Sequence, residues 1–579
     1  MTRPTSPGAP TGDPQEDDDT AARIDRLRAL LETASPAEAG EAVRELMSLA
    51  ASGGGGEALD LAVRYSGRSD CSTEELVRLW AIADGDPFGF CENLPAPAYR
   101  ARKAVGKLVE LSEPGDGGHA LKLAARLISA DTYASKFLVR LWGTVRDPDG
   151  FAEHLLAPVF RREGRTELRF PRVSYPRGLR HLTMLESLRF EWCGELTDLG
   201  EVGELTGLTD LVLYGCGKVE DLTPIGRLSR LTRLDLGGCG AIEDFEPLLR
   251  LSGLRELILR GTKVGSVRGF GQALPALETL DLRSCRSFTD LDGLAELPSL
   301  TDLRLGDLDG LRDLAPFAAF PHLRSLHVQS RKGLRTLDGL GGLPQLAELE
   351  IDAGPELRTL EGLGGLPRLT KLTIRAPELR TLEGLGELPA LRKLTLTSCP
   401  ALADLTGLGR LPALRSLLIN GTAVRDLGGL SGSPLVTLSL LYMKDLESLS
   451  ALQGCPGLRE LKLTGCPLVE DIPLDRLERL SLSGARWADL SSLVGPRGPR
   501  TGGPGTSEPE DAAPFTALSH LAELDLRSHQ SLKDIRLLLD LPSLRHVHLA
   551  ESACLSSSAV VDPVVTDLRA RGVTVTIHG

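Results

Sequence analysis

The sequence predicts an α+β fold in which an all-α helical-repeat domain precedes a long solenoid with one parallel β-sheet. Three observations lead to this prediction. Leucine recurs at one fixed interval through the middle of the chain, and a helical apolar pattern fills the segment before it. Only 4% of the residues are aromatic although 41% are hydrophobic, so leucine must build most of the core. Stacked turns of chain allow one repeated side chain to do this.

The repeated phrase is Leu-x-x-Leu-x-Leu-x-x-Cys, as in Leu231–Cys239 and Leu277–Cys285. Its first leucine returns without a change of interval at Leu185, Leu208, Leu231, Leu254, Leu277, Leu300, Leu323, Leu346 and Leu369. Apolar residues that alternate along a strand point to one face, so Leu-x-Leu predicts a strand with one buried and one exposed side. The variable x positions then form the exposed face of the sheet.

The ninth position of the phrase favours a small residue that can satisfy the backbone groups of a turn. Cysteine occupies it in six coils, at Cys193, Cys216, Cys239, Cys285, Cys399 and Cys466. Thr262 and Thr422 take the same place, so packing explains these cysteines better than a metal site does. We expect them to be reduced and buried. Leu308, Arg331 and Pro377 depart from the rule, which indicates that the middle coils turn differently.

The phrase and its period resemble those of the leucine-rich repeat superfamily over about two thirds of the chain. The resemblance is to short bacterial classes whose convex side carries 3₁₀ turns or extended chain. A coil as short as the interval from Leu231 to Leu254 leaves little room for a full convex α-helix. The repeats also resemble the ligand-sensing arm of bacterial NACHT-type proteins, although no NTPase is present in this sequence. The resemblance implies a fold but no single function, because the superfamily has many.

The predicted order of domains is a disordered tail over 1–20, an all-α domain over 21–163, a solenoid over 164–556 and a C-terminal cap over 557–579. The tail contains four prolines and three consecutive aspartates, and such a composition cannot bury enough apolar surface to fold. A Gly- and Pro-rich insert over 495–514 interrupts the coils and is predicted to be a disordered loop. In the cap we expect a helix over 558–571, despite Pro563, and a strand over 573–577.

Two tandem units of about 62 residues make up the all-α domain, so equivalent residues of the two units are offset by that length. The segment Leu76-Val-Arg-Leu-Trp80 recurs letter for letter as Leu138-Val-Arg-Leu-Trp142. We expect Trp80 and Trp142 to occupy equivalent core positions. The next segment, Thr166–Phe170, has the alternation of the repeat without its leading leucine. It is predicted to be a capping strand, because the open end of a solenoid must be covered.

Several classes of function are disfavoured by composition and motifs. The formal net charge is −13 and no basic stripe is present, which argues against a nucleic-acid partner. No secretory signal is visible, and neither is an apolar run long enough to span a bilayer, so we expect a cytoplasmic protein without a membrane partner. A phosphate-binding P-loop, a nucleophile elbow and a zinc-protease motif are all missing. We therefore expect no enzyme activity, no cofactor and no metal. His546 and His548 follow Glu523 and Asp525 by one period of the repeat, which favours charge pairing across strands over a metal site.

These observations favour a non-catalytic protein-interaction scaffold or ligand sensor that uses the concave face of the coils. Two alternatives remain. The acidic, thiol-rich chain is similar to ribonuclease-inhibitor-like proteins and could wrap a basic enzyme. An enzyme whose chemistry lies in the helical domain is the other alternative, although no nucleophile–base spacing supports it. The sequence does not identify the protein partner.

We predict a partner-binding site on outward positions of three neighbouring coils: Glu348, Glu350, Asp352, Lys371, Arg375 and Lys393. Advancing by one period of the repeat gives the lateral neighbour of a residue, which pairs Glu348 with Lys371 and Asp352 with Arg375. Glu350 then faces Thr373 and His327, so it is expected to be the least neutralised acid and the most available to a partner. A second, apolar site on the same face is predicted nearer the helices, at Val212, Tyr214 and Ile258.

Overall fold

The computed structural model describes residues 14–51, 134–171, 177–308, 310–469, 476–483, 518–527, 535–550 and 558–578, with 58, 61–62, 65, 105–106, 108–110, 121–122, 124–125 and 128. Trp80, the insert over 495–514 and three of the ten cysteines lie outside the described residues. The chain forms two compact units, Met1–Leu231 and Thr232–Gly579. Each unit is described by itself.

The first unit begins with helices, which are α1 (Pro14–Leu31), α2 (Pro36–Ala51), α8 (Ala134–Trp142), α9 (Pro148–Phe151) and α10 (Ala157–Glu163), with a π-helical turn over Ala152–Leu156. Helix α1 begins at Pro14, inside the tail that was predicted to be disordered. Proline suits the first position of a helix, and the acidic residues that follow it suit the helix N-terminus. Val43 and Leu46 are fully buried, and so is Val105, which matches Val43 at the predicted offset.

Three parallel strands complete the first unit: β1 (Glu167–Pro171), β2 (Ser187–Glu191) and β3 (Asp210–Val212). The predicted capping strand is therefore confirmed as β1. Trp142 of α8 is fully buried, its ring centroid is 5.8 Å from that of Phe170, and Phe170 stacks on Phe190 at 5.1 Å. The Trp142 indole N–H donates to the carbonyl oxygens of Pro148 (2.9 Å) and Arg177 (3.1 Å). Trp142 is a core residue, as predicted, and it joins the last helices to the first coils.

The second unit contains fifteen parallel strands in its described part, each paired with the next along the chain. They are β4 (Arg233–Asp235), β5 (Glu256–Ile258), β6 (Thr279–Leu282), β7 (Asp302–Leu305), β8 (Ser325–Ser330), β9 (Glu348–Ala353), β10 (Lys371–Arg375), β11 (Lys393–Cys399), β12 (Ser416–Thr422), β13 (Thr437–Leu441), β14 (Glu460–Thr464), β15 (Arg479–Ser483), β16 (Glu523–Leu526), β17 (His546–Ala550) and β18 (Thr574–His578).

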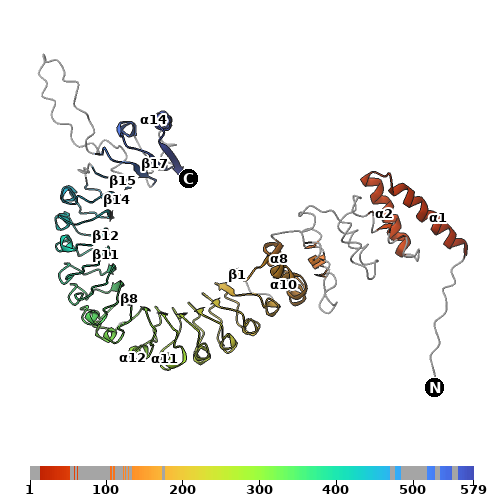
Figure 1. Ribbon diagram of the computed structural model, residues 1–579, viewed down its shortest axis with the longest axis horizontal. Coiled ribbons are helices and arrows are strands. Elements are labelled where there is room, and N and C mark those ends of the chain that lie inside the picture. Colours follow the sequence, from red (N-terminus) through yellow and green to blue (C-terminus); the bar gives the residue numbers. More distant parts are fainter. Residues whose placement is uncertain are drawn as a thin grey trace, which may run out of the picture. The chain divides into compact units, whose positions relative to one another are not determined.

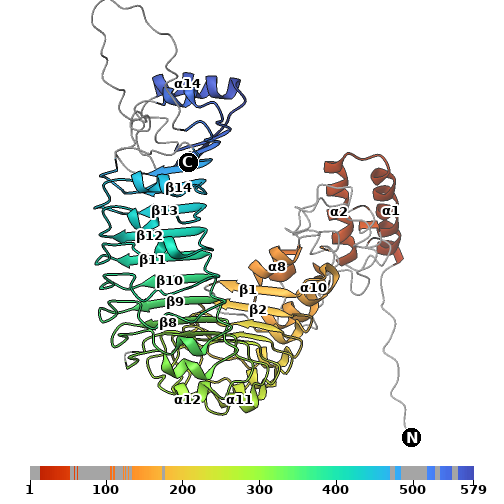
Figure 2. The same ribbon diagram turned by 60° about the vertical axis from the view of Figure 1, so that its left-hand side comes forward.

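The return segments of the second unit are short. They include the single-turn helices α11 (Phe270–Ala273) and α12 (Leu291–Leu294) and the 3₁₀ turns Glu246–Arg250, Ala315–Ala319, Leu340–Gly342, Leu408–Arg410, Gly428–Leu430, Ser450–Gly454 and Arg536–Asp540. In the first unit 3₁₀ turns also occur, at Leu179–His181, Val202–Glu204 and Ile225–Arg227. In the second unit the strands line the inner side of the curve, and α11 and α12 lie on its outer side (Figures 1 and 2). The concave sheet and convex 3₁₀ turns predicted from the repeat are confirmed.

Cysteine at the ninth position packs as predicted. All six of these cysteines are at most 3% exposed. The thiols of five donate to backbone carbonyls, as in Cys193 to Phe170 (3.3 Å) and Cys285 to Leu259 (3.0 Å), and the other three are Cys216, Cys399 and Cys466. Burial raises the pKa of the Cys216 thiol to about 12. The small residue at this place therefore satisfies a turn carbonyl that has lost access to water.

Three middle coils turn differently, and the irregular ninth positions Arg331 and Pro377 indicated two of them. The coil of Leu308 was also expected to differ, but it has the left-handed turn of the regular coils at Asp307. Strands β8 and β9 run on to Ser330 and Ala353, which are buried at the eighth position of their coils, and Ala376 is buried at the eighth position of the next. Ten other described coils have a left-handed backbone at this position, with positive φ at Trp192, Gly215, Gly238, Gly261, Ser284, Asp307, Ser398, Gly421, Tyr442 and Gly465.

The predicted cap is present as α14 (Ser558–Ala570) and β18, which pairs in parallel with β17. Helix α14 contains Pro563 and contacts both β18 and the 3₁₀ turn over Arg536–Asp540. The helix covers the last coil because an uncovered solenoid end would expose its leucine core. Among the helices in the described part of the chain, none is long and apolar enough to cross a membrane.

Candidate functional site

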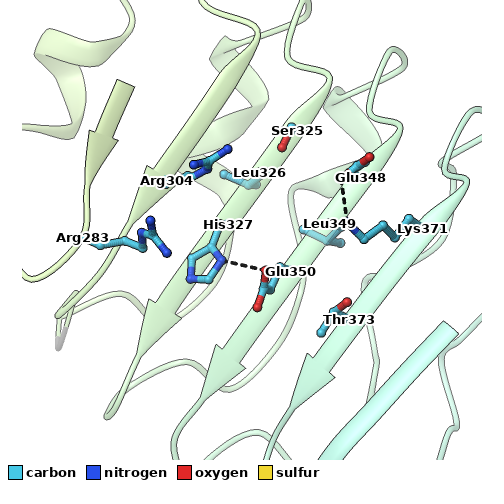
Figure 3. A pocket seen from close by; sticks show the side chains of 10 residues that line it. All are labelled: Arg283, Arg304, Ser325, Leu326, His327, Glu348, Leu349, Glu350, Lys371 and Thr373. Carbon is cyan, nitrogen blue, oxygen red and sulfur yellow. Dashed lines mark hydrogen bonds and ion pairs between the residues drawn. The ribbon is translucent and has the colours of Figure 1, made fainter. Parts of the chain in front are cut away.

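The exposed face of strands β7 to β10 contains a hollow of about 280 Å³ (Figure 3). Its lining side chains are Arg283, Arg304, Ser325, Leu326, His327, Glu348, Leu349, Glu350, Lys371 and Thr373. Parallel strands in register place equivalent residues of successive coils side by side. One lateral row is Arg304, His327, Glu350 and Thr373, and its order follows directly from the strand pairing.

Glu350 lies at the centre of this row and contacts Arg375 and His327. Its Oε1 accepts a hydrogen bond from Arg375 Nη1 at 2.5 Å, and its Oε2 lies 3.0 Å from His327 Nδ1. Burial pushes the pKa of Glu350 upward, but the hydrogen bonds from Arg375 and His327 outweigh burial and hold the pKa below its ordinary value. The expectation that Glu350 is the least neutralised acid is therefore wrong.

One of the two predicted lateral ion pairs is confirmed. Lys371 Nζ donates to Glu348 Oε2 at 3.0 Å. Asp352 instead accepts from Gln329 Nε2 at 3.1 Å, although its lateral neighbour in the sheet is Arg375. Arg375 bonds Glu350 and not Asp352 because its long guanidinium side chain also spans the diagonal to the residue two positions along the neighbouring strand.

The two arginines of the hollow contact acids that lie two residues before them in the chain. Arg283 makes a bidentate contact with Asp281, whose side chain is almost completely buried, and this contact raises the pKa of Arg283. Arg304 Nε lies 3.2 Å from Asp302 Oδ1. Lys393 is exposed on the neighbouring strand β11. The hollow is thus a surface of alternating, largely compensated charges.

The second predicted site is only partly present. Val212 is 4% exposed and so is not available to a partner, contrary to the prediction. Its strand neighbour Arg189 bonds Asp210 at 2.8 Å, so long charged side chains surround this small apolar residue. Tyr214 is partly exposed and packs edge-on against Trp192, with 5.0 Å between ring centroids. Ile258 is also partly exposed, but it belongs to the second unit.

Sequence reasoning named His327 as a neighbour of Glu350 but missed the arginines of the lining. One period back from His327 lies Arg304, so the same arithmetic could have found this residue. Counting by the period of the repeat could not have identified Arg283, because this residue lies in a different lateral row and in a more distant coil. The hollow extends three coils beyond the predicted site on the Arg283 side.

The late histidines pair with acids in the predicted register. His546 lies beside Glu523, and His548 lies beside Asp525. The closest charged contact is diagonal, with His548 Nε2 at 3.4 Å from Glu523 Oε1, and His548 Nδ1 lies 3.3 Å from His578 Nε2. Among the described residues, no three His, Cys, Asp or Glu side chains are grouped so that they could hold a metal ion.

The regular leucine repeat and the coil-by-coil parallel sheet define this chain as a leucine-rich repeat protein. No protein-family model matches it, and no curated protein is similar enough to match. Solved structures with similar coils include an internalin C2 of Listeria monocytogenes, at 24% identity over 38% of this chain and 91% of that chain, with a TM-score of 0.31. An internalin of the inlF type from the same organism is 18% identical over 72% of this chain and 94% of that chain, with a TM-score of 0.32.

A third similar structure is a complex of TLR13 with single-stranded RNA, at 20% identity over 64% of this chain and 53% of that chain, with a TM-score of 0.39. Likenesses of this size carry no argument on the function or the partners of this chain. The expectation that this chain has no nucleic-acid partner therefore remains a prediction.

Proposed function

We propose that this chain is a non-catalytic, cytoplasmic interaction or ligand-sensing protein whose concave face binds a protein partner around strands β8 to β11. The observation that carries the proposal is the hollow itself. It is lined by side chains of both charges, which are held in place by their mutual contacts and not by the leucine core. Charged groups that are already oriented cost little further ordering when a partner docks.

The same geometry speaks against a hydrolytic site in the hollow. Glu350 orients His327 as a carboxylate orients a catalytic imidazole, and Ser325 lines the same hollow. A nucleophilic serine also needs a hydrogen bond to the base that activates it. Among the described contacts, no hydroxyl or thiol is bonded to His327. The hollow therefore supports recognition better than catalysis.

Placement of a photo-crosslinking amino acid at Glu348 or Lys393 tests the proposal. Both side chains are exposed on the concave face, and Glu387, exposed in the return segment between β10 and β11, is the matched control. We expect one protein partner to crosslink from the two concave positions and not from position 387. Equal crosslinking from all three positions would contradict the proposal, and an RNA adduct in place of a protein would overturn the choice of partner.

The identified partner then allows a quantitative test. Exchanging the charges at Glu348 and Lys393, as Glu348→Lys with Lys393→Glu, should weaken binding about tenfold, mainly through slower association. The circular dichroism spectrum should not change, since both side chains point away from the core. Glu350→Lys is a poor test of binding, because it would place a third cation beside Arg375 and His327.

A further inference from the structure

The eighth position of the coil offers an internal comparison between residues that share one backbone conformation. Ten described coils have a positive φ there, and five of them use glycine, at Gly215, Gly238, Gly261, Gly421 and Gly465. Trp192 (φ 58°) and Tyr442 (φ 53°) are the two large side chains among the ten. A left-handed backbone is unfavourable for a bulky residue, so each aromatic costs conformational energy that glycine would not.

Burial does not compensate for this cost. The side chains of Trp192 and Tyr442 are 56% and 58% exposed, which makes them the most exposed large hydrophobic residues in the described chain. An exposed aromatic residue in a strained backbone has no evident role in stability. Strained residues of this kind concentrate at sites of function.

The neighbouring coil is shaped to hold the Trp192 ring in place. Gly215 follows it at the same position of the next coil, and a Cβ there would lie 2.6 Å from Trp192 Cε3, so only glycine leaves room for the indole. The Trp192 backbone N–H donates to the Tyr214 carbonyl at 2.7 Å. The two rings meet at an interplanar angle of 79°. Trp192 and Tyr214 therefore present a fixed aromatic surface.

The two coils that carry Trp192 and Tyr214, residues 185–230, have an acidic balance. They contain nine Asp or Glu and four Lys or Arg residues, a balance of −5 out of the −13 of the whole chain. Glu191, which directly precedes Trp192, is bonded by Arg169, and Glu195, 72% exposed in the same coil, is bonded by Lys218. A tryptophan face attracts cations through its quadrupole, and the surrounding acids add a field of the same sense.

We propose that Trp192 and Tyr214 form a docking point for an arginine side chain in a basic segment of a protein partner. Arginine fits both features, because its guanidinium stacks on an aromatic face and keeps its charge at every physiological pH. This docking point lies in the first unit and does not depend on the function proposed for the hollow in the second unit.

Tyr442 supplies a matched control. It has the same backbone conformation and exposure, and Gly465 gives it room in the same way, since a Cβ there would lie 2.9 Å from Tyr442 Cδ1. Residues 435–476, the coil of Tyr442 and the next one, contain six acidic and four basic residues, so their charge balance of −2 is smaller than the −5 of residues 185–230. Tyr442 thus separates the effect of an exposed aromatic residue from its combination with the more acidic surroundings of Trp192.

Binding of a labelled peptide with six alternating arginines and glycines, followed by fluorescence anisotropy on the full chain, tests the proposal. Trp192→Gly leaves the charge unchanged and places at this position the residue that five other coils use. We expect it to weaken binding of the arginine peptide about fivefold, while Trp192→Phe retains most of the affinity and Tyr442→Gly has no effect. The thermal unfolding of Trp192→Gly should stay within a few degrees of the parent chain.

Two results would overturn the proposal. Equal affinity of Trp192→Gly and the parent chain would show that net charge alone attracts the peptide. An equal loss of peptide affinity in Tyr442→Gly would show that any exposed aromatic residue is sufficient to bind the peptide. A peptide with glutamate in place of arginine should bind far more weakly, and equal binding of that peptide would remove the argument from charge. None of these results depends on whether the hollow between β7 and β10 binds a partner.

Discussion

Removing the Glu350 carboxylate should destabilise the second unit, whereas removing that of Glu348 on the same strand should not. Glu350 contacts Arg375 and His327, and the three side chains are 36%, 42% and 14% exposed. Glu348 contacts Lys371 alone, and these two side chains are 53% and 47% exposed. Both glutamates point outward from β9, so replacement by alanine changes strand propensity equally at the two positions.

The magnitudes follow from the two environments. A hydrogen bond to a charged group contributes about 1.5–3 kcal/mol when it is shielded from water, and an exposed ion pair contributes about 0–1 kcal/mol. Partial exposure of Glu350 and Arg375 discounts the first figure, so Glu350→Ala should cost about 1–2 kcal/mol of unfolding free energy. Glu348→Ala should cost less than about 0.5 kcal/mol.

The assay is urea denaturation of both variants, followed by far-ultraviolet circular dichroism. Long repeat arrays do not always unfold in one step, so hydrogen exchange of the β9 amides should accompany the bulk transition. Equal destabilisation by the two substitutions would refute the reasoning, because the pairing of Glu350 with two cations would then contribute nothing beyond one exposed pair.

The sign of the pH dependence gives a second check on Glu350. Its pKa in the folded chain is below the ordinary value of 4.5, so its contribution to stability is present above that value and disappears as the pH falls through the folded pKa. The difference between Glu350→Ala and the parent chain should therefore be largest near neutral pH and should shrink as the pH falls below 4.5 and through the folded pKa. A difference that grows on acidification would contradict the assignment of the contacts.

Three further predictions concern stability. Burial raises the pKa of Asp235, so above the ordinary pKa of 3.8 the folded chain disfavours the charged carboxylate. Asp235→Asn can still accept the hydrogen bond from the Gly237 N–H. The substitution should therefore raise the denaturation midpoint at pH 7 and have no effect near pH 3. Cys239→Ser should cost about 1 kcal/mol in chemical denaturation, and thiol titration of the denatured parent chain should count all ten cysteines. Deletion of 495–514 should leave the melting temperature within a few degrees, since long loops cost little to close; collapse of the coils would show that this segment packs.

The period of the repeat predicted everything that depends on which Cα atoms lie side by side. Strand register follows from the interval between leading leucines, so the lateral neighbours of Glu350 were predicted correctly as His327 and Thr373. Burial of the ninth-position cysteines was also predicted, because a small residue inside a turn has few alternatives. These features are set by the backbone, and a repeated sequence repeats its backbone.

The errors arose where side-chain length decides the contact. Register places Arg375 beside Asp352, but the guanidinium reaches Glu350 and leaves Asp352 to Gln329. Val212 occupies an outward position and is nevertheless buried, since Arg189 and Asp210 pair beside it. An additive rule on residue numbers cannot anticipate either outcome, because it treats every outward side chain as equally long.

Comparison among coils also shows how stability and binding can be separated in a repeat protein. Ten coils share one backbone conformation at the eighth position, and glycine is the residue that adopts this conformation at the lowest cost. Ser284, Asp307 and Ser398 depart from glycine with small polar side chains, which tolerate this conformation more easily than bulky ones do. Trp192 departs with the largest side chain of all, places it in water and has a glycine beside it that makes room. Five other coils make the same turn with glycine, so the turn itself does not require an aromatic residue, and the proposed contact with a basic partner accounts for the exposed ring.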